Sequence, residues 1–269
     1  MFCLILFKTL LIKSMGGINM NSTIETIYNR VSLRRYSDKP ISKDHLNIIL
    51  NSAIKAPTAG NMMMYSILKI TDNNIKEKLS ITCDNQPFIK NAPVVLIFLA
   101  DLNKWFKYFE LCEIENVKSP GMNDFMLSVN DALIAAQNAV VAAESLGIGS
   151  CYIGDIMENY EIHKELLNLP NYVFPAAMLT LGYYPNNYKK IYRDRFDDQY
   201  VIFDDKYKEL SDDEILSMFS VKESNMPKTN KFNAKNFGEL IYNRKTTADF
   251  SIEMERSIIE NLKFFLGKK

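Results

Sequence analysis

The chain has 269 residues, 47% of them hydrophobic and 12% aromatic, which is enough to bury one sizeable core or one core with an appendage. Its 32 basic and 32 acidic side chains balance, so no net charge attracts the whole molecule to nucleic acid or to an anionic membrane. We therefore expect its partners to be small molecules or protein. The cysteines lack C-x-x-C spacing and histidine is scarce, so we expect no metal site and no disulfide framework, and a reducing cytoplasm fits best.

The start of the chain resembles a short apolar targeting stretch, but Lys8 interrupts an apolar run that is too short to span a bilayer. We expect residues 1–19 to be a disordered or non-native extension, with Met20 as the functional start. Directly after it, Ser22-Thr23-Ile24-Glu25 has the pattern of a capping box, which predicts the start of a helix.

Hydrophobic periodicity and turn residues predict the helices and strands that follow. A helix begins at Ser42 and is ended by Pro57. The long apolar stretch 128–146, stopped by Gly147, predicts a mostly buried helix that needs cover from more than one side, in a central core or at a subunit interface. Strands are predicted at residues 65–70, 93–100, 149–153 and 176–181, and further helices at 161–167 and 253–266.

The run at 93–100 is apolar throughout, so we expect a central strand that is covered on both faces. Pro170 and Pro175 are expected to bracket the connection that precedes the strand at 176–181. Beyond Tyr200 the pattern loosens into charged and polar stretches. We therefore expect residues 20–200 to form the main domain and residues 201–269 to be an excursion and arm of the same domain.

Four clusters carry residues suited to chemistry. Residues 30–36 offer arginine and serine donors to a phosphate, although a solvated basic helix end has the same composition. Small residues in the turn at 57–61 let a planar or phosphorylated ligand approach the backbone, but an ordinary loop needs no ligand. Residues 147–155 do not match the Rossmann fingerprint, which lies between a strand and a helix, because they follow a helix and lead into a strand. Residues 189–195 form a late basic cluster that is typical of a solvated surface.

Taken together, these clusters resemble one family, the FMN-dependent nitroreductases, and particularly the NADPH-type oxygen-insensitive nitroreductases and flavin reductases. The similarity covers residues 22–196 in order and spacing and returns more weakly at 241–262. The matching segments are Arg30 to Arg34 with Pro40-Ile41, residues 56–61, Thr71-Asp72, Gln86 with Ala92-Pro93, residues 131–149, Tyr152-Ile153-Gly154, residues 166–170 and Leu181-Gly182-Tyr183. A match of this length is more specific than any single motif.

The resemblance implies an α+β fold with a central, mostly antiparallel sheet flanked by helices, and a homodimer whose arms interleave around FMN sites at the subunit interface. It implies non-covalently bound FMN, NADPH or NADH as reductant, and ping-pong transfer of two electrons to nitroaromatics, quinones or free flavin. Two alternatives remain open. One is an FMN carrier or storage protein without nicotinamide turnover, and the other is a related flavin enzyme with a specialised substrate and a lid at residues 103–123.

The resemblance also assigns site residues, and none of them is required as a catalytic side chain. Phosphate and ribityl contacts are assigned to Arg30, Val31, Ser32, Arg34, Arg193 and Arg195, with Lys190 as a rival for the last two. Contacts along the flavin are assigned to Pro57, Thr58, Ala59, Gly60 and Met62, to Gln86 from either subunit, and to Tyr152, Ile153, Gly154 and Asp155, with a main-chain N–H of Gly154 or Asp155 donating to flavin N5. Lys222 is the candidate contact for the 2′-phosphate of NADPH.

Three positions depart from the family pattern. The late cluster, usually Lys-x-Arg, is matched here by Arg193-Asp194-Arg195. Met62-Met63-Met64 stands where Gln or Pro often follows the turn, which suggests either a permissive acceptor pocket or ordinary core packing. Asp155 replaces what is commonly a small residue, so it places a negative charge beside the predicted flavin ring.

Overall fold

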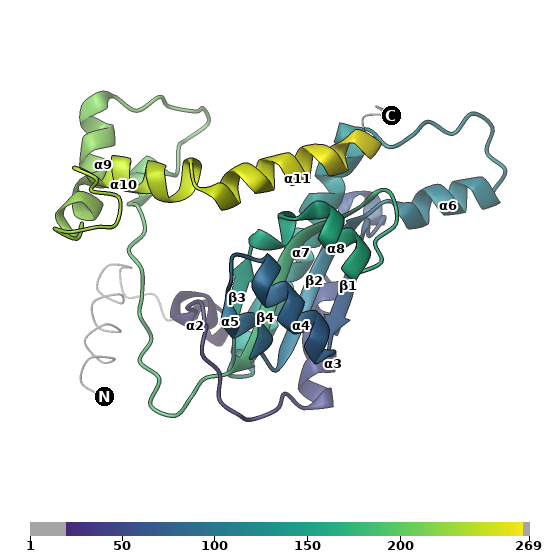
Figure 1. Cartoon of the computed structure of the whole chain (residues 1–269), viewed down its shortest axis with the longest axis horizontal. Coiled ribbons are helices and arrows are strands. Elements are labelled where there is room, and N and C mark those ends of the chain that lie inside the picture. Colours follow the sequence, from purple (N-terminus) through teal and green to yellow (C-terminus); the bar gives the residue numbers. More distant parts are fainter. Residues whose placement is uncertain (1–19, 266–269) are drawn as a thin grey trace.

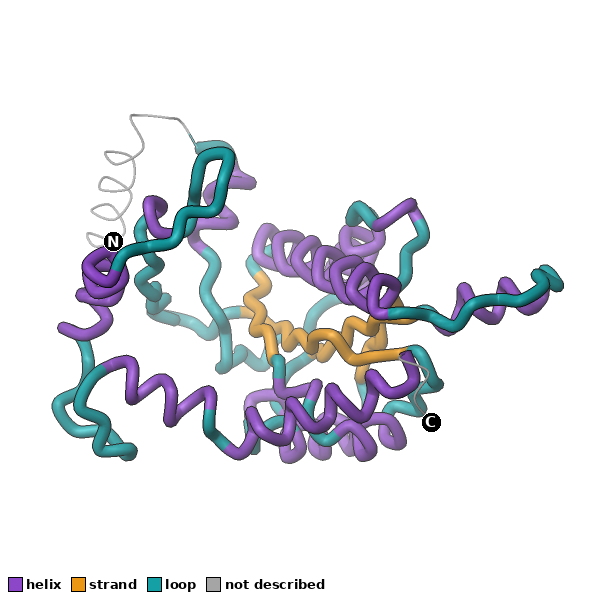
Figure 2. The backbone as a smooth tube through the Cα atoms, turned by 90° about the horizontal axis from the view of Figure 1, so that it is seen from above, coloured by secondary structure: helices purple, strands orange, loops and turns teal. Residues whose placement is uncertain are grey.

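The structure of the chain, a computed structural model, describes residues 20–265. The extension predicted for residues 1–19 lies outside this range. A sheet of four strands lies between layers of helices (Figures 1 and 2). The strands are β1 (Tyr65–Ile70), β2 (Val94–Asp101), β3 (Ile148–Ile153) and β4 (Val173–Tyr183).

The strand order is β1-β2-β4-β3, and every neighbouring pair is antiparallel. This confirms the predicted α+β class and its antiparallel sheet. All residues of β2 are buried, as its unbroken apolar sequence predicts for an inner strand. Pro175 lies inside β4, so its predicted place in the preceding connection is wrong. The register of β2 shifts between Phe98 and Leu99, opposite Pro175, and this irregularity accommodates a residue that has no N–H to donate.

Helices cover both faces of the sheet. Those before and between the strands are α2 (Ser22–Asn29), α3 (Lys43–Ile54), α4 (Asn73–Thr82), α5 (Pro87–Lys90), α6 (Asn103–Leu111), α7 (Met122–Ser145) and α8 (Tyr160–Leu166). Those after β4 are α9 (Asp212–Ser224), α10 (Phe237–Ile241) and α11 (Asp249–Phe265). Short single-turn helical segments lie at η1 (Ala59–Asn61), η2 (Asp155–Met157), η3 (Asp198–Tyr200) and η4 (Tyr242–Thr246).

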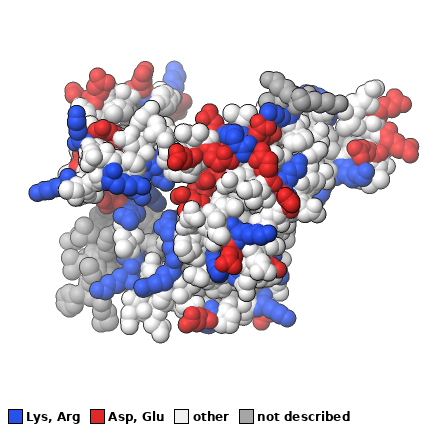
Figure 3. Space-filling model, in the orientation of Figure 1, with Lys and Arg blue, Asp and Glu red and all other residues white. Residues whose placement is uncertain are grey.

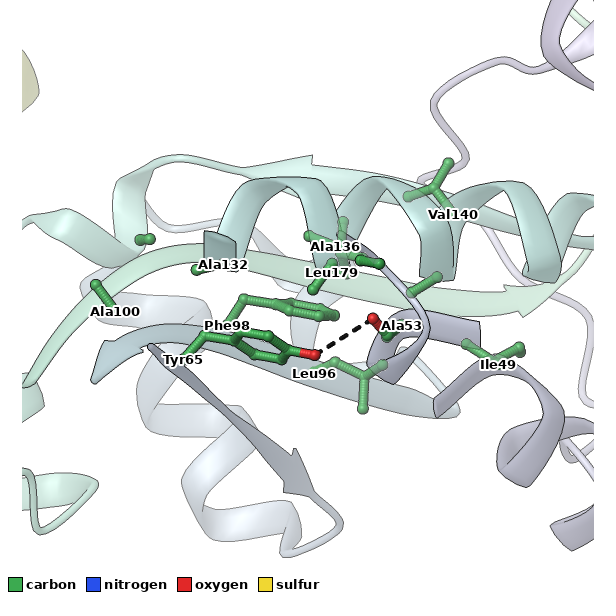
Figure 4. Packing of buried hydrophobic residues seen from close by; sticks show 14 of the residues in the cluster. Ile49, Ala53, Tyr65, Leu96, Phe98, Ala100, Ala132, Ala136, Val140 and Leu179 are labelled. Atoms are coloured by element: carbon green, nitrogen blue, oxygen red, sulfur yellow. Dashed lines mark hydrogen bonds between the residues drawn. The ribbon is translucent and has the colours of Figure 1, made fainter. Parts of the chain in front are cut away.

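Alternating side chains of β2 divide the core in two. Leu96 and Phe98 face α3 and α7, where small side chains such as Ala136 allow the helix to approach the sheet closely (Figure 4). Val95 and Ile97 face the opposite way, in a second cluster that α4 and α5 help to cover. The sheet is therefore the middle of three layers.

Helix α7 is the central helix that the sequence predicts, but it begins at Met122 and not near residue 128. Gly121 donates its N–H to Asp124 Oδ2 at 2.8 Å, which caps the earlier start. By length and composition α7 could cross a membrane, yet it packs against all four strands, as a core helix does. Five of its large apolar side chains are exposed, those of Met122, Met126, Leu127, Leu133 and Ile134.

The first helices begin at side-chain caps. Asn21, not Ser22, caps α2, because its Oδ1 accepts the Ile24 N–H at 3.0 Å. The predicted capping box is therefore wrong, because the residue three positions after this cap is Ile24, whose side chain cannot accept a hydrogen bond. Ser42 caps α3 as predicted, with its hydroxyl accepting the His45 N–H at 3.2 Å.

The chain after β4 leaves the sheet as a long extended stretch and carries α9 and α10 away from the core, and α11 then returns across α8 (Figure 1). The return is anchored by Ser257, Asn261 and Phe265, which are buried. Phe219 of the excursion packs edge-on against Phe196 and tilted against Phe237, with ring centres 5.1 and 6.4 Å apart. Helix α6 projects from the other end of the molecule.

Candidate functional site

The basic segment that follows α2 runs alongside strand β3. The Leu33 N–H donates to Ser150 O at 2.8 Å, and Ser32 pairs with Ser150 in a parallel bridge. Side chains alternate along extended backbone, so Val31 and Leu33 are buried while Ser32 and Arg34 are exposed. The polar members of the segment therefore form a row on the outside of β3, and the predicted contact at Val31 can involve only its main chain.

Glycine allows this close approach. A Cβ on Gly149 would lie 2.7 Å from Leu33 Cδ2 and 2.8 Å from the Tyr184 ring. No other residue type could occupy this position of β3 without moving the basic segment or Tyr184.

The charges of Arg30 and Arg34 reach the side chains of β3. Burial raises the pKa of the Cys151 thiol, and both guanidinium groups oppose that shift. Burial also raises the pKa of Tyr152 to about 12, against the charge of Arg30. Neither arginine forms a salt bridge with any carboxylate of residues 20–265. Both are therefore available to an external anion.

The donor set beside β3 suits a phosphate. Two guanidinium forks and the Ser32 hydroxyl supply charge-assisted hydrogen bonds of the kind that phosphate oxygens accept. The Ser150 hydroxyl, at the same level of β3, is buried and has no hydrogen-bond partner within the described part of the chain. A buried unpaired hydroxyl is uncommon, and it marks this position as one where a partner is missing.

The late basic cluster meets the first one through Lys190. Its Nζ donates to Asn29 O at 2.7 Å and lies 3.8 Å from Glu144 Oε2, while Tyr184 donates to Glu144 Oε1 at 2.8 Å. Basic side chains gather between α2 and the extended stretch after β4 (Figure 3). The two clusters, distant in sequence, thus lie together in the fold.

Arg193 and Arg195 differ from Lys190 in being uncommitted. Both are exposed, and neither forms an ion pair with residues 20–265. Lys190 is already engaged by a carbonyl and a carboxylate. This contrast favours the Arg193-Asp194-Arg195 assignment over its rival, although the contact with a cofactor stays a prediction.

The predicted site residue Gln86 contacts the turn after β3. Gln86 Nε2 donates to Asp155 Oδ2 at 2.7 Å and to Cys83 O at 2.9 Å. Gly154 is exposed, and a Cβ placed on it would meet only Met157 Cε, at 3.8 Å. Arg34 Cζ lies 5.8 Å from the centre of the Phe88 ring, two residues after Gln86. One chain therefore brings together the basic segment, Gln86 and the turn at Gly154 and Asp155.

In the turn at residues 57–62, Gly60 has a φ of 56°, which a residue without a Cβ adopts readily. Asp131, which is buried in α7, holds this turn in place. Its two oxygens accept the N–H groups of Ala59 at 2.9 Å and Met64 at 3.2 Å. No role is predicted for Asp131 from the sequence, although a carboxylate inside an apolar helix signals a buried partner.

The structure does not bring this turn to the other site residues. The turn precedes β1, whereas the basic segment lies along β3, and these strands are the two edges of the sheet. Three inter-strand spacings, about 14 Å, separate the edges. Pro57, Thr58, Ala59, Gly60 and Met62 are thus apart from the Arg34 and Asp155 region of the same chain.

Two further features bear on ligands. A cavity of about 630 Å³ opens beside Arg34, Tyr36 and Phe88, so it borders the row along β3 at Arg34, but neither Gln86 nor the turn after β3 lines it. No group of three or more His, Cys, Asp or Glu side chains within residues 20–265 is arranged to hold a metal ion.

The Nitroreductase family model matches residues 27–183. The chain is 34% identical over 176 residues to the FMN reductase (NADPH) of Bacillus subtilis, covering 62% of this chain and 68% of that protein. It is 32% identical over 246 residues to a Cr(VI) reductase of Pseudomonas sp. (strain G-1), covering 91% and 97%. The solved structure of the NfrA1 nitroreductase from B. subtilis matches with a TM-score of 0.78 at 28% identity, covering 89% of this chain and 98% of that chain.

Proposed function

The chain belongs to the nitroreductase family, and from that premise we propose that it moves two electrons from NADPH or NADH to small acceptors by a ping-pong mechanism. It is an NAD(P)H-dependent oxidoreductase that uses FMN. The observation that carries the proposal is the row of donors along β3, whose arginines are bound to no carboxylate within residues 20–265.

The residues of this chain have separate tasks in the proposed site. Arg30, Ser32 and Arg34 would hold the FMN phosphate, and Arg195 would add a further positive charge from the late cluster. Gln86 and the main chain at Gly154 and Asp155 would hold and orient the ring. Bound there, FMN would supply the redox chemistry by accepting hydride from the nicotinamide and reducing the acceptor.

We further propose that the protein is a homodimer. The turn at residues 57–62 lies at the sheet edge opposite the basic segment, so a second copy is needed if the turn is to complete the site. Exposed apolar side chains, Ile27 on α2 and Met126, Leu127 and Ile134 on α7, supply a surface that a second copy would cover. Gln86 contacts Asp155 of its own chain, which favours its acting in the site of the subunit that provides the arginines.

Lys222 is our candidate for binding the 2′-phosphate of NADPH. Its Nζ lies 4.8 Å from the centre of the ring of Phe196, the residue that follows Arg195 in the sequence. Helix α9 therefore places Lys222 beside the late basic cluster. A cytoplasmic location is proposed because Cys83, Cys112 and Cys151 are all unpaired thiols, as a reducing compartment requires.

Anaerobic reduction of the purified FMN-loaded protein tests this function. Stoichiometric NADPH or NADH should bleach the yellow colour, and an acceptor added afterwards should restore it. Relatives are named for reducing FMN and Cr(VI), and another is an oxygen-insensitive NADPH nitroreductase, so the acceptor panel should contain free FMN, chromate, a nitroaromatic and a quinone. Colour that persists with both nicotinamides would instead support an FMN carrier or storage protein.

A further inference from the structure

A buried acidic group lies directly behind the turn after β3. Glu158 follows η2 and is only 4% exposed. Its Oε1 is buried and has no hydrogen-bond partner within the described part of the chain. An ionised carboxylate in such a position would lose its hydration without replacement, which is costly in free energy. The burial of Glu158 therefore favours its neutral acid form.

The neighbour of Glu158 leads to the same conclusion. Glu158 and Asp155 belong to one tight turn, in which the Glu158 N–H donates to Asp155 O at 3.1 Å. Two ionised carboxylates in one turn repel each other, whereas a proton held by one of them allows it to donate a hydrogen bond to the other. Burial and then the hydrogen bond and charge of Asp155 raise the pKa of Glu158 to about 8.

The other titratable groups near Glu158 supply no positive charge that would stabilise its ionised form. Asp84 after α4 and Glu253 from α11 raise its pKa further. Glu253 is itself paired with Arg256 at 2.8 Å. His163 from α8 is buried between Ile156 O and the Thr82 hydroxyl, and burial lowers its pKa, so it is neutral near pH 7.

We propose that Glu158 is a positioning residue for the flavin site: it shares one proton with Asp155 and thereby holds Asp155 where it accepts the hydrogen bond from Gln86. Asp155 Oδ2 and Gln86 Nε2 are 2.7 Å apart. The inference rests on the proposed function, because Gln86 and Asp155 count there as residues beside the flavin ring. Loss of the shared proton leaves two negative charges in contact, and Asp155 is then repelled from the position that orients Gln86.

The first test uses the protein without added flavin. The folded protein binds the Glu158 proton up to a pKa of about 8, whereas the unfolded chain releases it near 4.5, so stability falls as pH rises through this window. The lowered pKa of His163 acts in the opposite direction, but only below its ordinary value of 6.5. Melting temperatures are therefore compared from about pH 7 to about pH 9, where the wild-type protein should lose stability and then level off.

The matched variants are Glu158→Gln, which keeps a hydrogen-bond donor toward Asp155 but cannot ionise, and Glu165→Gln, which changes an exposed glutamate of α8. Glu158→Gln should abolish the Glu158 part of the pH dependence, and Glu165→Gln should retain the wild-type curve. If Glu158→Gln does not fold, Asp155→Asn serves instead, because removing the neighbouring charge should reduce the slope. Identical slopes in wild type and in the Glu158 or Asp155 variant would overturn the shared proton.

The second test measures the FMN dissociation constant over the same pH range by quenching of flavin fluorescence. Wild-type affinity should weaken severalfold more than that of Glu158→Gln as pH rises, and titration of the FMN phosphate cancels in this comparison. Equal pH dependence would overturn the positioning role while leaving the proposed function standing. Failure of the wild-type protein to bind FMN at any pH would refute the proposed function and this role with it, and the stability test would still decide whether the proton is shared.

Discussion

The basic segment beside β3 and the acidic turn after the same strand hold their charges in opposite ways. Arg34 is exposed and forms no salt bridge with residues 20–265, so water solvates its charge until an anion replaces that water. Glu158 is 4% exposed and keeps a proton. The basic segment can therefore bind a negatively charged group of a ligand. The turn after β3, in contrast, carries less negative charge beside the proposed flavin ring because Glu158 is protonated.

The largest effect on FMN affinity is expected when an arginine of the basic segment is removed. Arg34→Ala deletes charge-assisted hydrogen bonds to phosphate and should weaken FMN binding by roughly 100-fold, giving a folded but colourless protein. Flavin content after purification and an FMN titration measure this. Arg35→Ala is the matched control, because the Arg35 guanidinium lies by the Tyr188 ring at 6.0 Å and has no assigned contact. If Arg34→Ala stays fully yellow, the phosphate assignment is wrong.

The contact between the basic segment and β3 can be strained without touching a charge. In Gly149→Ala the new Cβ would collide with Leu33 and Tyr184, at 2.7 and 2.8 Å. We expect a loss of about 1–3 kcal/mol in the free energy of unfolding, measured by denaturant titration. Gly154→Ala is the control for stability, since its Cβ would meet only Met157 Cε at 3.8 Å. Equal stability of the two variants would show that the segment does not pack on β3 as described.

Substitutions at the turn after β3, where Gln86 donates to Asp155, should weaken FMN binding less. Gln86→Leu removes the donor to Asp155, a hydrogen bond of 2.7 Å, and should weaken FMN binding by roughly tenfold. Isothermal titration of FMN measures the change. Gln86→Glu sharpens the comparison, because a further carboxylate beside Asp155 should make binding decline with rising pH. An unchanged affinity in both variants would remove Gln86 from the site.

The smallest effect is expected in the excursion. Lys222→Ala should raise the KM for NADPH by about threefold and leave the KM for NADH unchanged, since an exposed charge pair contributes little. Steady-state kinetics with both nicotinamides measure this, and Lys228→Ala, another lysine of the excursion, is the control. Equal changes with NADH and NADPH would refute the assignment.

Much of the fold could be predicted because local patterns and packing agree. The apolar runs of β1 and β2 and the serine cap of α3 appear where the sequence places them. Element boundaries and irregularities were less accessible. Helix α7 starts early because Asp124 caps Gly121, and Pro175 sits within β4 because a register shift absorbs it. Both depend on a single contact that periodicity does not reveal.

The candidate site was predictable as residue types but not as an arrangement. Arg34 and Gln86 were identified from their resemblance to a family, and the structure places both near β3. The sequence could not show that Asp155, 69 positions from Gln86, would be its partner. Nor could it show that Glu158, three residues after Asp155, is buried, because one charged residue in a short polar turn is ordinarily solvated.

In the proposed site, β3 carries the flavin with the phosphate at the basic segment and the ring at the turn of Gly154 and Asp155. The most direct measurement compares the affinities for FMN and for riboflavin, which lacks the phosphate, in the wild type, Arg34→Ala and Glu158→Gln. The wild type and Glu158→Gln should both prefer FMN strongly, and Arg34→Ala should lose most of that preference. A preference for FMN that survives in Arg34→Ala would show that the basic segment does not bind the phosphate.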